Sequence, residues 1–458
     1  MTTLRGPGLF RNRDFSLLLS GQLISAIGNQ AESMALPLIV LALTGSATQA
    51  GFVLGLGTLT FLVFGLVAGA LVDRWDRKAT MIWCELGRTV LAGGVAVTLW
   101  LDKLTMPQLY ATTVLAGILT TLFQVANTAA LPNVVGRRQL SAALGCSQSA
   151  GSAVGVFGAS LAGALYAAGR TVPFAVNAVS FAVSAASLRL MRARFQLDRQ
   201  DARTSRLTAE IREGLGWLWR QPVIRFLTLV SAADKVRYGA GYLLIITLAR
   251  QLGASSLWIG VIFSGAAVGA LAGALVADWA ARRFPLGRIA VMMLWLEALM
   301  FPLYALAPNP LLLAAVAAAE SLVAPVYAVA MTAHQLAITP DELRGRTTSA
   351  VSTLTTGALS IGALASGALI STLGAKPPVW LCGAWLLALA LLATANRTVR
   401  QAPPAGTTPQ QKATGTAETA DVAGQERGTV VGNWPGAGSG GRSQSPGLAV
   451  GRWWWRAR

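Results

Sequence analysis

Long apolar stretches alternate with short polar segments along the first 400 residues of the chain. A helix needs about 20 apolar residues to cross the hydrocarbon core of a bilayer, and it satisfies its own backbone hydrogen bonds there. Twelve stretches approach or exceed this length: residues 15–43, 48–72, 79–101, 107–131, 141–168, 170–190, 223–249, 256–281, 286–307, 309–333, 346–373 and 377–396. The pattern therefore predicts an all-α integral membrane protein with about twelve transmembrane helices.

The second half of the chain repeats the first at a fixed offset of 204 residues. Gly65–Val72 (GLVAGALV) recurs as Gly269–Val276 (GALAGALV), and Gly158–Leu165 (GASLAGAL) recurs as Gly362–Leu369 (GALASGAL). Two distant segments that share one ungapped offset indicate that a six-helix unit was duplicated. Because six helices return the chain to the same side of the membrane, we expect parallel repeats related by an axis along the membrane normal.

The repeat and the composition together predict the boundaries of the parts. We expect an N-terminal half at residues 1–190, a cytoplasmic linker at 191–222 and a C-terminal half at 223–400. Within the linker, Leu207–Arg220 (LTAEIREGLGWLWR) mixes Trp and Leu with Arg and Glu, which is typical of a short helix along the membrane interface. Residues 401–458 are rich in Gly, Pro, Ser, Thr and Gln, so we expect a disordered cytoplasmic tail.

The chain carries a formal net charge of +18, although only 12% of its residues are charged, and about 25% is usual in soluble proteins. Its Lys and Arg residues concentrate in alternate loops, as in the cytoplasmic loops of membrane proteins. We therefore expect a multi-pass protein of the cell (inner) membrane with both termini in the cytoplasm, and no nucleic-acid partner. The three Cys and one His show no metal-ligand spacing, so we expect no metal and no cofactor.

A short charged loop follows the second apolar stretch. It reads Gly69-Ala-Leu-Val-Asp73-Arg74-Trp-Asp76-Arg77-Lys78. A carboxylate at a helix end, beside a cationic turn, can bond to helix termini and guanidinium groups on one face of the membrane. The usual excess of basic residues in cytoplasmic loops would explain the cations but not Asp73 among them. We predict a cytoplasmic gating loop that holds one conformation, formed by Gly69, Asp73, Arg74, Arg77 and Lys78.

The G-x-L-x-D-R-x-x-R-K pattern of this loop resembles the cytoplasmic motif of the major facilitator superfamily. From about Phe10 to Asn396 the chain also resembles the enterobactin/macrolide-efflux branch. The residues that carry this second resemblance are Gly21-Gln22, Asn29, Leu131-Pro132-Asn133, Leu140-Ser141-Ala142 and Gly158. The resemblance implies the major facilitator fold, alternating access to a central site, coupling to protons and export. Two positions depart from the family pattern: Ala277 stands where Asp73 would repeat, and Ala159 follows Gly158 where proline is usual.

Carboxylates inside the apolar stretches are candidate proton carriers. A charge at the bilayer centre costs about 2.5–3.5 kcal/mol on insertion scales, so such residues usually face a cavity or a partner. A carboxyl group removed from water is harder to ionise, which lets it bind and release a proton near neutral pH. We predict Glu32, Asp234 and Glu320 as proton-coupling residues. Asp234 has an equal alternative as a structural partner of Lys235 or Arg237.

Polar residues that share helical faces predict where a substrate would lie. The candidate cavity residues are Gln22, Asn29, Gln124, Asn127, Gln148, Tyr238, Tyr242 and Tyr327. Glu297 fits a functional or a structural role equally well, whereas Glu85 and Arg88, one turn apart, are interpreted as an intrahelical pair. The few fixed charges favour an amphipathic solute of moderate size over a sugar phosphate or an inorganic anion.

Three classes of function fit a polytopic membrane protein: a transporter, an enzyme, and a non-transporting sensor or scaffold. The polar helical faces favour a cavity, which a sensor does not need. An enzyme could use Asp73 and Asp76 as a metal-diphosphate motif, but such enzymes need several converging carboxylates. The sequence contains no G-x-x-x-x-G-K-[ST] motif, which binds the phosphates of ATP. We therefore do not expect transport to be driven directly by ATP. We predict a monomeric, proton-coupled secondary exporter of small amphipathic molecules, such as a drug, a macrolide or a siderophore-like compound, and keep the membrane enzyme as the alternative.

Overall fold

A computed structural model describes residues 11–135, 139–193, 195, 207–340 and 343–396 of the chain. Its helices form two sets. The first set is α1 (Arg13–Thr44), α2 (Ala47–Arg74), α3 (Arg77–Trp100), α4 (Met106–Val135), α5 (Leu140–Ala168) and α6 (Val172–Leu190). After α7 (Leu207–Arg220), the second set is α8 (Pro222–Gln251), α9 (Ser256–Arg283), α10 (Leu286–Met300), α11 (Leu303–Leu306), α12 (Pro310–Ser321), α13 (Val323–Ile338), α14 (Arg344–Leu373) and α15 (Lys376–Ala395).

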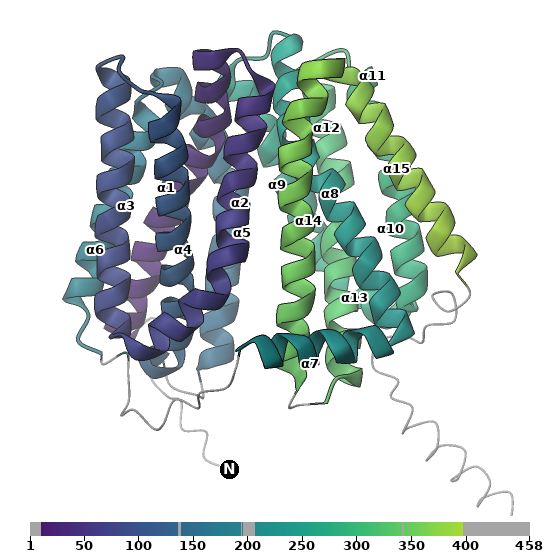
Figure 1. The fold of residues 1–458 in the computed structure, drawn as a ribbon, viewed down its shortest axis with the longest axis horizontal. Coiled ribbons are helices and arrows are strands. Elements are labelled where there is room, and N and C mark those ends of the chain that lie inside the picture. The colour runs from purple at the N-terminus through teal and green to yellow at the C-terminus, as the bar shows by residue number, and fades with distance from the viewer. Residues whose placement is uncertain (1–10, 136–138, 194, 196–206, 341–342, 397–458) are drawn as a thin grey trace, which may run out of the picture. The chain divides into compact units, whose positions relative to one another are not determined.

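Each set packs around buried apolar side chains of its own. Phe15 and Met81 belong to a cluster built from the first set, and Leu227 and Leu294 belong to a cluster built from α7 and the second set. Figure 1 shows the two sets beside each other. In the repeat, α14 and α15 begin 204 residues after α5 and α6. We call the two sets the first half and the second half.

The described helices include eleven segments that are long and apolar enough to cross a membrane. The remaining long helix, α8, has 30 residues and carries Asp234, Lys235 and Arg237 in its middle. These charges lower its hydropathy, but its length matches that of the spanning helices around it. The predicted all-α membrane fold, with two parallel six-helix repeats, is confirmed.

Two helical segments of the second half are interrupted, whereas the corresponding helices of the first half are continuous. Pro302 separates α10 from α11, because proline lacks the backbone N–H that a continuing helix needs. Leu322 separates α12 from α13. The equivalent helices α3 and α4 run without a break for 24 and 30 residues. The break at Pro302 follows Glu297, and the break at Leu322 follows Glu320, each within about one helical turn. Both carboxylates therefore lie beside irregular backbone.

Glycines bring the two halves into close contact at the end of the bundle opposite α7. A Cβ placed on Gly163 of α5 would lie 2.4 Å from the Ser256 carbonyl oxygen of α9. One placed on Gly367 of α14 would lie 2.5 Å from the Ala47 carbonyl oxygen of α2. On the same face of α5, but toward the α7 end, no described atom lies within 4 Å of a Cβ placed on Gly145. The halves are therefore closed at one end and spread apart toward the other.

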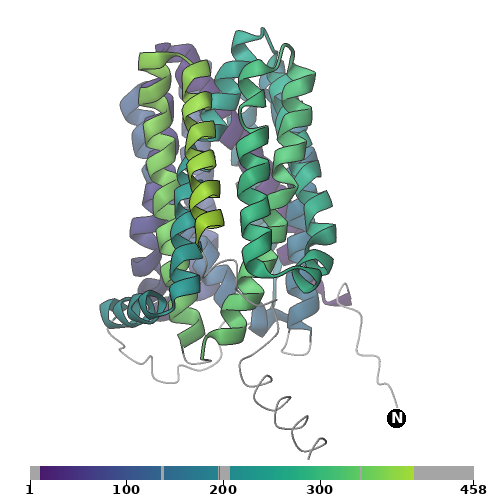
Figure 2. The same ribbon diagram turned by 90° about the vertical axis from the view of Figure 1, so that its right-hand side faces the viewer.

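Helix α7 lies across the other helices in both views (Figures 1 and 2). Its Leu218 is fully buried, and Trp217 packs against the apolar cluster of the second half. Its Glu213 forms an ion pair with Arg346 near the start of α14. Apolar and ionic contacts therefore fasten α7 to the second half.

Candidate functional site

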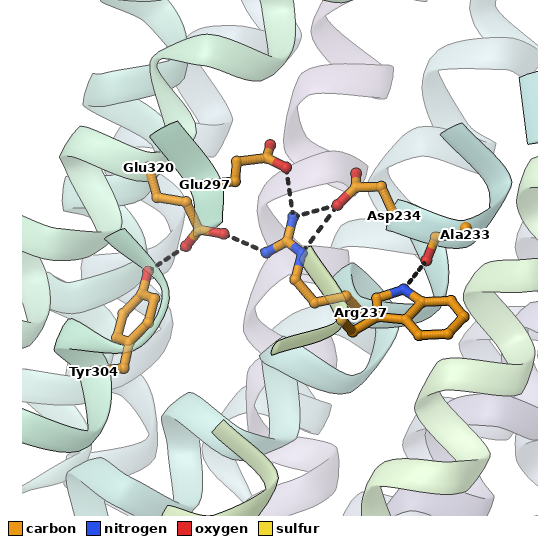
Figure 3. Close-up of polar contacts among 7 residues, drawn as sticks. Ala233, Asp234, Arg237, Glu297, Tyr304 and Glu320 are labelled. Atoms are coloured by element: carbon orange, nitrogen blue, oxygen red, sulfur yellow. Dashed lines mark hydrogen bonds and ion pairs between the residues drawn. The ribbon is translucent and has the colours of Figure 1, made fainter. Parts of the chain in front are cut away.

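Arg237 lies at the centre of a buried charged cluster in the second half. It comes from the middle of α8, and its side chain is 3% exposed. Its Nε and Nη2 donate hydrogen bonds of 2.9 and 2.8 Å to Asp234 Oδ1, one helical turn earlier. Its Nη1 donates to Glu320 Oε1 of α12, and its Nη2 lies 3.7 Å from Glu297 Oε2 of α10. Three carboxylates from three helices thus converge on one guanidinium group (Figure 3).

Aromatic side chains surround this cluster. The Tyr304 hydroxyl donates a 2.7 Å hydrogen bond to Glu320 Oε2, and the Phe301 ring centre lies 5.1 Å from the guanidinium carbon of Arg237. Phe301 lies at the break after α10 and Tyr304 in the one-turn helix α11 that follows it, so the interruption of the helix places both rings at the site. The indole of Trp385 donates a 3.0 Å hydrogen bond to the Ala233 carbonyl oxygen and fixes α8 against α15.

The cluster holds an excess of acidic groups. With every group ionised, Asp234, Glu297 and Glu320 would leave a net charge of −2 around Arg237. Uncompensated charge in a buried site is strongly unfavourable, and a proton or a further cation offsets it. The arrangement can therefore bind a proton or a cationic group.

The cluster borders a cavity of about 350 Å³, a volume within the range of small-molecule sites. Both halves line it, because Gln30 of α1 and small residues of α5 face the second half there. The Tyr242 and Phe263 rings in its wall lie 4.6 Å apart between centres, and the Tyr242 hydroxyl donates a 3.4 Å hydrogen bond to the Ser33 carbonyl oxygen of α1. A ligand in this cavity would therefore contact both halves.

A second buried charged cluster lies in the first half. Glu85 and Arg88 of α3 form a 2.9 Å ion pair and are 0% and 3% exposed, which confirms the predicted intrahelical pair. The Ser184 hydroxyl of α6 donates a 2.8 Å hydrogen bond to Glu85 Oε1. The Arg88 guanidinium carbon lies 4.8 and 4.3 Å from the ring centres of Phe123 and Phe181. None of these residues lines the cavity.

The three carboxylates predicted as proton-coupling residues are divided between the halves. Asp234 and Glu320 line the cavity. Glu32 accepts a hydrogen bond from Asn177 Nδ2 of α6, and the Ser180 hydroxyl donates a 3.0 Å hydrogen bond to the Oδ1 of the same Asn177. Glu32 therefore belongs to a polar network of the first half, and Arg237 is the predicted structural partner of Asp234.

The predicted cavity residues are divided as well. Tyr238 and Tyr242 line the cavity. Gln22 Nε2 donates a 2.5 Å hydrogen bond to Asn127 Oδ1, which joins α1 to α4 within the first half.

Gln22, Asn127 and the other four predicted residues are not among those lining this cavity. The side chains of Asn29, Gln124 and Gln148 are exposed. Tyr327 is buried in the second half, where its hydroxyl forms a 2.7 Å hydrogen bond with that of Ser231. Helix α13, which carries Tyr327, starts after the break at Leu322. Tyr327 therefore does not point in the direction that a continuous helix would give it relative to Glu320 in α12.

Gln30 lines the cavity but was not predicted to do so. It is turned by about 80° around α1 from Gln22 and by about 100° from Asn29, so the polar face predicted from those residues did not include it. For Glu297 the sequence did not decide between a functional and a structural role, because its surroundings depend on how α8 and α10 pack. No local pattern encodes that packing.

Side chains of the charged loop between α2 and α3 form hydrogen bonds with backbone groups in or beside helices of the first half. Asp76 caps the start of α3, Arg77 Nη1 donates a 2.9 Å hydrogen bond to the Ala129 carbonyl oxygen of α4, and Lys78 Nζ donates one of 2.6 Å to the Met191 carbonyl oxygen after α6. These three interactions stay within one half. They stabilise its α7-side end.

The remaining residues of the predicted gating loop make fewer described interactions. The side chain of Asp73 lies outside the described part of the structure, and that of Arg74 is exposed. No described atom lies within 4 Å of a Cβ placed on Gly69. In the second half, Asp278 pairs with Arg282 of the same helix at 2.7 Å, and both side chains are at least 70% exposed.

Residues 7–432 match the protein family described as transmembrane secretion effector. The chain is 28% identical over 229 residues to an uncharacterized MFS-type transporter, YfiS, of Bacillus subtilis, in a match that covers 47% of this chain and 52% of that protein. It is 32% identical over 154 residues to macrolide efflux protein A of Streptococcus pyogenes, covering 33% of this chain and 38% of that protein. The matches thus span about half of these relatives or less.

Solved structures share the fold. The nucleoside transporter NupG superimposes with a TM-score of 0.70 at 12% identity, covering 83% of this chain and 98% of the other. A bacterial homologue of the iron transporter ferroportin, in an inward-facing state, gives a TM-score of 0.65 at 18% identity, covering 85% and 99%.

The family match decides between the transporter and the membrane enzyme. Asp76, which an enzyme would use as a metal ligand, caps the start of α3. The matched family and the named relatives are transporters, as the resemblance of the charged loop implied. This chain is a multi-pass membrane transporter, not an enzyme, and belongs to the transmembrane secretion effector family of the major facilitator superfamily.

Proposed function

We propose that this transporter couples protons to the export of small amphipathic molecules by alternating access. The observation that carries the proposal is the Arg237 cluster, in which three carboxylates border a cavity lined by both halves. A proton and a basic substrate would compete there for the same excess negative charge. Binding of one then favours release of the other, which is the requirement for exchange.

The proposed path of an exported substrate uses the two ends of the bundle in turn. The halves are closed opposite α7 and spread apart toward α7. The loop with Arg74, Arg77 and Lys78 lies at the α7 end, which we assign, with both termini, to the cytoplasm. Substrate would enter from that side, and the halves would then close there and part at the opposite end. The similarity to macrolide efflux protein A supports export.

The cavity wall supports an amphipathic substrate. Tyr238, Tyr242, Phe263 and Phe301 contribute aromatic rings to it, which suit apolar surfaces and cationic groups. The acid-rich cluster would bind a basic group on the same molecule. Because one chain forms the whole cavity, a monomer is sufficient.

Proton exchange in everted membrane vesicles tests this proposal. With an acidified lumen, adding erythromycin or ethidium, two amphipathic cations, should release luminal protons and raise the luminal pH. D234N and E320Q should abolish this response, while D278N, which changes an exposed carboxylate, should retain it. E32Q should reduce the response if the proton path includes the first half. A wild-type protein that responds to neither probe would reject proton-coupled export of this substrate class.

A further inference from the structure

The three acidic side chains around Arg237 differ in the hydrogen-bond donors that they receive. Asp234 Oδ1 accepts two N–H groups of Arg237. Glu320 accepts one N–H of Arg237 on Oε1 and the Tyr304 hydroxyl on Oε2. Glu297 is 2% exposed, and its Oε2 is a fully buried atom without a hydrogen-bond partner in the described structure. Its 3.7 Å approach to Arg237 Nη2 is longer than a hydrogen bond.

Glu297 also lies against a second carboxylate. Its Oε2 and Asp234 Oδ1 approach the same nitrogen, Nη2 of Arg237, at 3.7 and 2.8 Å. Two ionised carboxylates that share one cation at this range repel each other, and neither can donate a hydrogen bond. A proton on Glu297 removes this repulsion.

The charged and tyrosine side chains near Glu297 come from four helices. In the part of the chain that the structure describes, those that line the cavity with it are Asp234, Lys235, Arg237, Tyr238 and Tyr242 of α8, Tyr304 of α11 and Glu320 of α12. Tyr327 of α13 belongs to the same buried apolar cluster as Met293 and Leu294 of α10. Three of the five N–H groups of Arg237 bond to Asp234 and Glu320, and its Nη2 stays 3.7 Å from Glu297 Oε2. Lys235 also lines the cavity, where its Nζ lies 4.6 Å from the Tyr238 ring centre. The hydroxyls of Tyr304 and Tyr327 donate elsewhere.

We propose that Glu297 holds a proton at neutral pH and is the group that releases it during transport, while Asp234 and Glu320 stay ionised as the counter-ions of Arg237. The release step rests on the proton-coupled transport proposed above; the protonated state does not. In that step the O–H bond of Glu297 breaks, its electron pair stays on the carboxylate, and the proton passes to water in the cavity. The cluster then changes from a net charge of −1 to −2, and a cationic group of a substrate can restore it to −1.

Infrared spectroscopy of the full chain in lipid nanodiscs tests the protonated state without a substrate. A protonated carboxyl group has a C=O stretching band that a carboxylate lacks, and this band is lost as the pH rises. We expect the wild type to show the band at neutral pH, and E297Q to lack it. E85Q, which removes another buried carboxyl group with an arginine on its own helix, serves as the matched control and should retain it. E297D, which keeps a shortened carboxyl group, should move the band instead of removing it.

A band that persists unchanged in both E297Q and E297D would overturn the proposal, and so would a wild-type spectrum without the band. The role in transport has a separate test in the everted vesicles. E297Q should lose all proton release on addition of erythromycin or ethidium while retaining binding of the probe. If the wild type released no protons, the proposed function would fail although the infrared result could stand. If E297Q released protons as the wild type does, only the assignment of Glu297 would fail.

Discussion

Each half of the transporter buries an arginine one helical turn after an acidic residue, and the two arginines have different surroundings. In the first half, Arg88 pairs with Glu85 of α3 and lies between two phenylalanine rings. In the second half, Arg237 pairs with Asp234 of α8 but also meets acidic side chains from α10 and α12. The same spacing along a helix gives an enclosed ion pair in one half and an acid-rich site in the other.

The difference shows that the neighbours of an ion pair decide its role. The two rings beside Arg88 offer favourable faces to a cation without adding charge, so the pair with Glu85 is balanced and suits a structural role. Around Arg237, Glu297 and Glu320 add negative charge next to a cavity. The helix breaks that accompany these two residues occur in the second half, whereas α3 and α4 are continuous.

Replacing the two arginines tests this comparison most strongly. R237M leaves the acidic groups of the cluster without their cation, and we expect the free energy of unfolding to fall by about 3–5 kcal/mol. R88M leaves chiefly Glu85, and methionine can pack between the same rings, so we expect a loss near the lower end of that range, about 3 kcal/mol. Denaturant unfolding of the full chain in detergent, followed by circular dichroism, measures both changes.

Double variants provide the control for this prediction. R88M/E85Q removes the whole pair of the first half and should recover most of the lost stability, because the remaining carboxyl group nearby, Glu32, keeps its hydrogen bond from Asn177. R237M/D234N should recover less, because Glu297 and Glu320 remain. Equal recovery in the two halves would contradict the distinction between an enclosed pair and an acid-rich site.

Local features of the fold could be predicted from the sequence, and the convergence of distant residues could not. Apolar length gives the helices, the 204-residue offset gives the duplication, and proximity along the chain left Lys235 and Arg237 as the two possible partners of Asp234, between which the structure decides for Arg237. The approach of Glu297 depends on how α8 and α10 pack. Tyr327 was predicted to line the cavity on the assumption of one continuous helix, but the break at Leu322 interrupts that helix.

Two glycines at the same place in the repeat provide a smaller test of how the halves differ. A Cβ placed on Gly273 would lie 1.9 Å from the Leu322 carbonyl oxygen at the break in the second half, whereas no described atom lies within 4 Å of one placed on Gly69. G273A should therefore lower the free energy of unfolding by about 1–3 kcal/mol. G69A should leave it unchanged or raise it by up to about 1 kcal/mol, because alanine favours a helix. The same unfolding measurement applies, and equal losses would show that both glycines serve helix packing.

The smallest expected difference lies in the charged residues at the α7 end of each half. Lys78 Nζ donates to the Met191 carbonyl oxygen and so links α3 to the end of α6, and we expect K78M to lower the free energy of unfolding by about 1 kcal/mol. Arg282 pairs with Asp278 on its own helix, and both side chains are largely exposed, so R282M should lower it by no more than about 0.5 kcal/mol. Raising the salt concentration should remove the effect of R282M first, because salt screens exposed charges more than partly buried ones. A larger effect at Arg282 would mean that the second half keeps a stabilising loop network despite Ala277, and the contrast between the halves would then be confined to their buried arginines.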